Sequence, residues 1–108
     1  MEKKEMLNKI ETKNELQEAL KSTRCCIIFT KDDCLHCAVV KNVIDDIKKE
    51  YPLINFCVTE SREITEAYHI NAYPTMHFYE NGSLQGTLIG SNNITKIKDI
   101  LNLWFLKN

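Results

Sequence analysis

Two cysteines stand three residues apart in the stretch Cys34-Leu35-His36-Cys37. This spacing is about one turn of helix, so the two side chains can face one another and close a small disulfide ring. A short apolar run (25–29) precedes the pair, and apolar residues at helical spacing follow it. A helix that begins at the cysteines would present unpaired N–H groups and a partial positive charge to a thiolate. Because the thiolate is the reactive form of cysteine, the pattern predicts an activated cysteine pair.

Metal binding is the main alternative use of such a pair. Structural zinc sites normally need four Cys or His ligands in two short-spaced pairs, and this chain has no second pair. We therefore expect no metal site. A chemically inert cysteine pair is disfavoured, because a helix N-terminus activates a thiol placed there. An iron–sulfur or zinc carrier assembled across a dimer stays open, and it would show as metal in the purified protein.

Three further cysteines, Cys25, Cys26 and Cys57, bring the total to five. An odd number at these spacings does not suggest a secreted disulfide framework. In a reducing compartment the three would be small buried hydrophobic residues, with Cys57 the better candidate for a regulatory thiol. We expect a cytoplasmic protein.

The composition predicts one globular domain over residues 1–108, with 44% hydrophobic and 27% charged residues. A net charge of −1 provides no strong field, so we expect neither nucleic acid nor a membrane surface as a partner. No apolar segment approaches the roughly 20 residues of a membrane helix. Residues 1–4 lead into no apolar run, so we expect no signal peptide.

The elements that must position the cysteine pair are predicted in the order β-α-β-α-β-α-β-β-α. A capping box, Thr12-x-x-Glu15, begins the first helix, and Tyr51-Pro52 ends the helix of the cysteine pair. Asn81-Gly82 predicts a hairpin with a type I′ turn. The predicted strands are 6–10, 25–30, 54–58, 75–79 and 84–89. Four helices are predicted: the first covers 13–22, the second runs from the cysteine pair to about residue 50, the third covers 61–68, and the fourth follows residue 91.

The alternation of strand and helix in the first part favours parallel pairing, and the hairpin adds antiparallel strands. A central mixed sheet with helices on both faces follows. We expect Ile64 and Ala67 to face inward from the third helix, and Trp104 and Phe105 to anchor the last helix in the core.

Four features coincide in order along the chain: the cysteine pair at a strand-to-helix junction, Pro74 before a strand, the Asn-Gly hairpin, and Gly90 before the last helix. With them the chain resembles the thioredoxin superfamily over nearly its whole length. The resemblance implies an α/β, thioredoxin-like three-layer fold and a cis bond between Tyr73 and Pro74. The Tyr73 backbone would then pair with an extended substrate, and Gly90 would line the same docking groove.

The resemblance also implies thiol–disulfide exchange, with Cys34 as nucleophile and Cys37 as resolving cysteine. The partners would be protein thiols and disulfides, and a reductase or a low-molecular-weight thiol would recycle the dithiol. No cofactor is expected beyond the internal disulfide, and we expect a monomer.

Several residues depart from the pattern of typical thioredoxins, which have Gly-Pro between the cysteines where this chain has Leu35-His36. A histidine there looks more like protein disulfide isomerase. We expect His36 to stabilise the thiolate, lower the pKa of Cys34 and raise the reduction potential. Asp33 stands where thioredoxins usually carry Trp.

The position six residues before Cys34 holds Ile28, where the family has a buried acid that accepts the proton of the resolving cysteine. His36, Glu60 or water could take over that task. The departures also keep a second reading open: a non-catalytic binding or redox-sensing module on the same fold. His69 and His77 lie near no motif, and we expect them to be structural or solvent-facing.

Overall fold

The computed structural model describes residues 7–103. Its core element is a five-stranded sheet with the strand order β1-β3-β2-β4-β5. The strands are β1 (Asn8–Ile10), β2 (Arg24–Phe29), β3 (Asn55–Thr59), β4 (Thr75–Glu80) and β5 (Ser83–Ile89). The helices are α1 (Lys13–Ala19), α2 (Leu35–Ile47), α3 (Arg62–Ala67) and α4 (Ile94–Leu101), and a 3₁₀ turn, η1 (Lys48–Glu50), follows α2.

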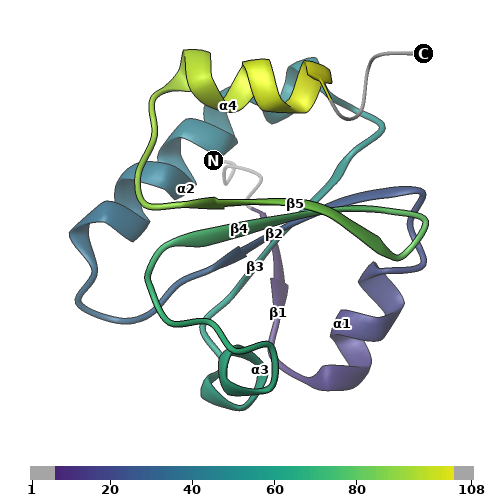
Figure 1. Cartoon of the computed structure of the whole chain (residues 1–108), viewed down its shortest axis with the longest axis vertical. Helices are drawn as coiled ribbons and strands as arrows, with labels where there is room; N and C mark the ends of the chain where they lie inside the picture. The colour runs from purple at the N-terminus through teal and green to yellow at the C-terminus, as the bar shows by residue number, and fades with distance from the viewer. Residues whose placement is uncertain (1–6, 104–108) are drawn as a thin grey trace, which may run out of the picture.

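The sheet is mixed, as the sequence predicts. Strands β1 and β2 run parallel to β3, whereas β4 is antiparallel to both β2 and β5. Helices α2 and α4 cover one face of the sheet, and α1 and α3 lie at the other (Figure 1). The predicted α/β fold is therefore confirmed, with helices on both faces of a central sheet.

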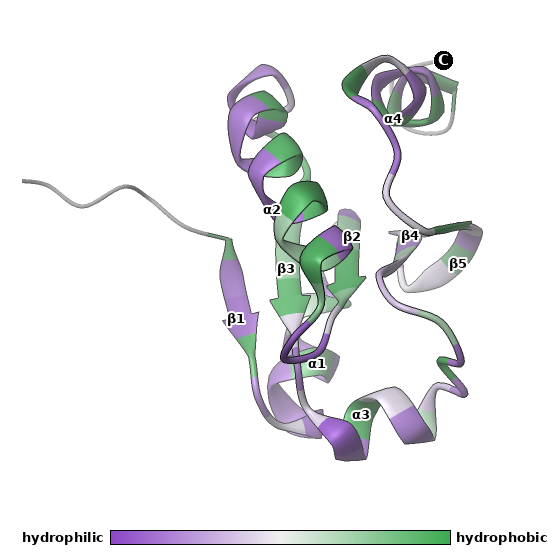
Figure 2. Ribbon diagram, turned by 90° about the vertical axis from the view of Figure 1, so that its left-hand side faces the viewer, coloured by the Kyte–Doolittle hydropathy of each residue, from purple (hydrophilic) through white to green (hydrophobic). Residues whose placement is uncertain are grey.

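The central strand β2 is buried on both faces. Its side chains alternate, so that Cys26 and Ile28 join a cluster under α2 and α4, while Ile27 and Phe29 join one toward α1 and α3. Figure 2 shows hydrophobic residues along β2 and β3 and mainly hydrophilic ones on the edge strand β1. Burial of each large apolar side chain stabilises the fold by about 1.5–3 kcal/mol. This core fixes the end of β2, which leads to the cysteine pair.

Local signals set the element boundaries. The predicted capping box at Thr12 and Glu15 is present, although α1 ends at Ala19, three residues before the predicted end. Asn81 (φ 52°) and Gly82 (φ 81°) both lie in the left-handed region, which confirms the type I′ hairpin.

One prediction about the helices is wrong, and another concerns residues outside the described part of the chain. In α3, Ile64 is buried as predicted, but Ala67 is exposed and Thr65 is buried instead. The Thr65 hydroxyl donates a hydrogen bond to the Arg62 carbonyl at 3.2 Å, which offsets the cost of its burial. The proposed anchors Trp104 and Phe105 lie outside the described residues. Within 7–103, none of the helices has both the length and the apolar character to cross a membrane.

His77 has a structural role in β4. Its side chain is buried, its Nδ1 lies 3.0 Å from the Tyr79 hydroxyl, and its ring packs edge-on against Phe29 with centroids 4.8 Å apart. Burial lowers the pKa of His77, because the charged imidazolium would lose its hydration.

We expect this lowered pKa to make folding acid-sensitive. The unfolded chain binds a proton on His77 more readily than the folded chain does. Stability is therefore fully present above the unfolded pKa of about 6.5 and falls as pH drops below it. Urea unfolding at a series of pH values from 7.5 to about 5 measures the effect. The variant His77→Gln should lose part of this pH dependence, whereas His69→Gln, at an exposed histidine, should keep the wild-type profile. Parallel profiles for all three proteins would contradict the assignment.

Candidate active site

Cys34 and Cys37 form a disulfide at the N-terminus of α2, with Cα atoms 5.2 Å apart. Cys34 is the N-cap residue and has extended backbone angles (φ −120°, ψ 102°). Its Sγ accepts a hydrogen bond from the Cys37 backbone N–H at 3.2 Å. The sulfur thus occupies the place that an N-cap oxygen normally takes, and the first-turn N–H groups and the helix dipole favour negative charge there by about 0.3–1 kcal/mol.

The two sulfurs differ in access. The Cys34 side chain is half-buried at the surface, whereas Cys37 is only 2% exposed. An incoming sulfur atom can therefore reach Cys34, while Cys37 is shielded behind it.

Two local features shape the turn before Cys34. Strand β2 is followed by Thr30, whose N–H and hydroxyl both donate to the Thr59 carbonyl, at 2.9 Å and 3.2 Å. Asp33 then adopts a left-handed backbone (φ 58°), a conformation that Asp tolerates better than most residues do. The sequence analysis missed this feature, because a lone Asp in a polar loop is a weak signal.

The segment before β4 meets the segment after β5. The Tyr73–Pro74 peptide bond is cis, and the Pro74 carbonyl accepts from the Gly90 N–H at 2.8 Å. Lys31, in the loop after β2, lies with its Nζ 5.3 Å from the centroid of the Tyr73 ring, a cation–π distance. These contacts bring Tyr73, Pro74 and Gly90 together beside the loop that leads to the disulfide.

His36 connects the disulfide loop to the same region. Its ring is exposed, and Nδ1 lies 3.1 Å from the Ser91 hydroxyl, next to Gly90. Ser91 is a site residue that the sequence analysis missed, because its partner is 55 positions away and no local pattern signals the pairing. The six predicted site residues therefore lie at one end of the sheet: Cys34, His36, Cys37, Tyr73, Pro74 and Gly90.

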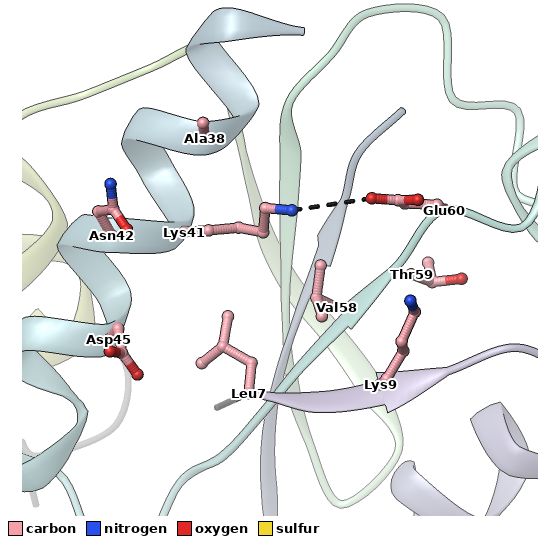
Figure 3. A pocket seen from close by; sticks show the side chains of 9 residues that line it. All are labelled: Leu7, Lys9, Ala38, Lys41, Asn42, Asp45, Val58, Thr59 and Glu60. Atoms are coloured by element: carbon pink, nitrogen blue, oxygen red, sulfur yellow. Dashed lines mark ion pairs between the residues drawn. The ribbon is translucent and has the colours of Figure 1, made fainter. Parts of the chain in front are cut away.

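No acid stands behind the disulfide in β2. Ile28 is fully buried and packs in the cluster that includes Val40 and Ile44. Glu60, one of the possible proton acceptors, pairs with Lys41 at 3.7 Å across a pocket of about 380 Å³ between α2, β1 and β3 (Figure 3). The structure therefore places one candidate in an ion pair at a pocket edge and another, His36, in contact with Ser91.

The remaining cysteines lie in the core. Cys25, Cys26 and Cys57 are all buried and outside any disulfide, as predicted for small hydrophobic residues. A hydrogen bond with Cys57, together with burial, raises the pKa of Cys25, and burial raises the pKa of Cys26. Both thiols are thus held in their unreactive, protonated form. Among residues 7–103, no three His, Cys, Asp or Glu side chains gather in a way that could hold a metal ion.

The family model and the relatives that match this chain all belong to the same family. The thioredoxin family model matches residues 6–103. The chain is 32% identical over 94 residues to thioredoxin from Geodia cydonium, which covers 81% of this chain and 89% of that protein. It is 26% identical over 93 residues to thioredoxin from Buchnera aphidicola subsp. Baizongia pistaciae, covering 82% and 85%.

Solved structures show the same fold. Plasmodium falciparum thioredoxin superposes with a TM-score of 0.84 at 22% identity, over 91% of this chain and 99% of that one. Oxidised mitochondrial thioredoxin 3 from Saccharomyces cerevisiae gives 0.81 at 22% identity, over 89% and 93%.

A redox-capable disulfide at a helix N-terminus and this fold together define a thiol–disulfide oxidoreductase. The chain belongs to the thioredoxin family. Its redox-active group is the Cys34–Cys37 disulfide. Proteins of this family act in general on protein disulfides and are recycled by a reductase.

Proposed function

We propose that the protein exchanges disulfides with polypeptide substrates, with Cys34 as the attacking residue and Cys37 as the resolving residue. The Cys34 thiolate attacks a substrate disulfide, and one substrate sulfur leaves as a thiolate. Cys37 then gives up its proton and attacks Cys34 Sγ, which releases the second substrate sulfur. Two electrons pass from the dithiol to the substrate. The observation that carries this proposal is the difference in access, with Cys34 reachable and Cys37 buried.

The docking groove of this proposal consists of Tyr73, Pro74 and Gly90. An extended substrate segment pairs with the backbone at Tyr73, as a strand added to a sheet edge does. Gly90 has φ +90°, and a Cβ added there would meet no atom within 4 Å apart from those of its two chain neighbours. A side chain at 90 would therefore project into the space that the substrate needs, besides straining the backbone.

The cellular setting is part of the same proposal. Three buried thiols outside any disulfide suit a reducing compartment, so we place the protein in the cytoplasm. We also propose that it acts as a monomer. A reductase or a low-molecular-weight thiol regenerates the dithiol, and no further cofactor takes part.

Reduction of insulin disulfides by dithiothreitol is the test. The wild-type protein at catalytic concentration should accelerate the reaction well above the rate with dithiothreitol alone. An unchanged rate would contradict the proposal and favour the non-catalytic binding module, whose structural support is the apolar Ile28 at the position of the family's buried acid.

We also propose that this disulfide is more oxidising than that of typical thioredoxins. The support is the position of His36 on the first turn of α2, two residues after Cys34, whose thiolate the helix N-terminus would stabilise once the disulfide is reduced. A stabilised thiolate favours the reduced protein, which makes the disulfide a stronger oxidant.

The expected reduction potential therefore lies above the roughly −270 mV of thioredoxin. Equilibration with glutathione buffers, read out by the mass of alkylated protein, measures it. The variant His36→Leu should lower the potential, whereas His69→Leu, at an exposed histidine away from the site, should not. A wild-type potential at or below the thioredoxin value would refute this proposal.

A further inference from the structure

A groove of about 620 Å³ lies between α2 and α4, beside the disulfide. Val39 and Val43 of α2 form one wall, Ile94 and Thr95 of α4 form the other, and the loop 91–93 lines it as well. This surface is called the α2–α4 groove below. Its loop contains Ser91, which contacts His36 at the N-terminus of α2. The groove therefore begins next to the disulfide.

An apolar stripe leads from the disulfide into this groove. Leu35, Val39 and Val43 follow one another at four-residue spacing, so they share one face of α2. Leu35 directly follows Cys34 and is 77% exposed, and Val39 is 44% exposed. Ile94, on the opposite wall, is 39% exposed. Exposed apolar residues that gather in one place mark an interaction surface, whereas single ones do not.

The α2–α4 groove is lined by uncharged residues, whereas a second depression near the disulfide is lined by charged ones. None of the residues that line the α2–α4 groove is charged. The second depression is lined by Lys31, Asp32, Glu60 and Arg62, the last of which begins α3. Helix α3 lies on the opposite side of the sheet from α4 (Figure 1). A polypeptide that crosses the disulfide from one depression to the other thus meets a neutral, apolar surface on one side and a charged surface on the other.

We propose that the α2–α4 groove binds the residues on one side of the substrate's reactive cysteine and selects uncharged, apolar ones. This inference rests on the proposed exchange with polypeptide substrates and specifies their sequence. Aliphatic side chains in the groove bury apolar area against Val39 and Ile94, which favours binding. A charged side chain there would lose hydration without gaining a partner of opposite charge.

Peptides with a single cysteine, held as a mixed disulfide with thionitrobenzoate, test the selection. The reduced protein attacks the peptide sulfur, and thionitrobenzoate leaves as a coloured thiolate. Two leucines are placed before or after the cysteine and compared with two aspartates or two lysines at the same place. We expect the leucine peptide to react about tenfold faster than the charged ones, but for one side of the cysteine only. Equal rates for all peptides would overturn the inference.

Variants locate the selection. Val39→Lys should abolish the preference for leucine and make the aspartate peptide the faster one, read as a ratio of rate constants within the same variant. Leu53→Lys is the matched control, because Leu53 is an equally apolar side chain, 78% exposed and outside the groove. Its ratio should equal that of the wild type. A leucine preference that persists in Val39→Lys would overturn the assignment to this groove.

Two further outcomes separate the explanations. If the reduced protein fails to react even with a small disulfide, such as the symmetrical disulfide of thionitrobenzoate, the proposed exchange is wrong and so is this inference. If it reacts with the small disulfide but does not distinguish the peptides, only the groove assignment fails. A second copy of this chain is the alternative occupant, and a dimer that Val39→Lys turns into a monomer would overturn the substrate assignment in its favour.

Discussion

Replacing Cys34 with serine is expected to reduce disulfide exchange by at least about a thousandfold, to the background rate of dithiothreitol alone. The thiolate is the nucleophile in this chemistry, and a serine hydroxyl stays protonated at neutral pH even at a helix N-terminus. Cys37 cannot take over the attack, because it is 2% exposed and its sulfur lies behind that of Cys34. Insulin reduction by dithiothreitol, followed by turbidity, measures the loss.

The companion change, Cys37→Ser, is expected to give a different defect. Cys34 keeps its thiolate and its position at the N-terminus of α2, so the first attack still occurs. No second thiol is then available to displace the substrate, and the mixed disulfide accumulates. Non-reducing electrophoresis and mass spectrometry should show substrate covalently bound to Cys34, and dithiothreitol should release it.

Cys57→Ala provides the control, because it removes a cysteine that lies buried in the core outside the redox pair. Once circular dichroism shows that this variant is folded, it should reduce insulin at close to the wild-type rate. If the wild type and Cys34→Ser instead behave alike, the protein is a binding module on the thioredoxin fold and not an oxidoreductase of insulin-type disulfides.

The fold was predictable because the strongest local signals agree with one another. The capping box at Thr12, the burial pattern of β2 and the Asn81-Gly82 turn each depend on neighbouring residues, and each has the predicted structure. Within the described residues, the errors are shifts of one to three residues at the ends of helices and strands, together with the exposure of Ala67. Ala67 is exposed because α3 is only six residues long and ends there, so one turn of helix meets the core through Ile64 and Thr65.

The candidate site was predictable only in part. Cysteine spacing marks the disulfide by itself, and the resemblance to a known family marks Pro74 and Gly90. The contact between His36 and Ser91 joins two segments that only the folded sheet brings together, so no sequence pattern could reveal it. The α2–α4 groove has the same origin: Val39 and Ile94 come from helices that are far apart in the chain.

Ile28→Asp is expected to destabilise the protein by about 4 kcal/mol or more, a large fraction of the 5–15 kcal/mol that a domain of this kind has. The family's buried acid would stand here, but in this chain the position is fully buried among Cys26, Val40 and Met76. An aspartate there forfeits the packing of the isoleucine and loses its own hydration. Burial would also raise the pKa of the new carboxyl, so the loss should grow as pH rises from about 4 to 7.

Urea unfolding of three variants separates these causes. Ile28→Val removes one methyl group and should cost about 1 kcal/mol at every pH, whereas Leu53→Asp adds the same acid at an exposed position and should stay within about 0.5 kcal/mol. If Ile28→Asp remains as stable as Ile28→Val and also accelerates insulin reduction, the site already provides for an acid, and Ile28 is not needed by the core. The expected result means instead that Ile28 belongs to the packing under α2, and that the proton of Cys37 must leave by a route that does not run through β2.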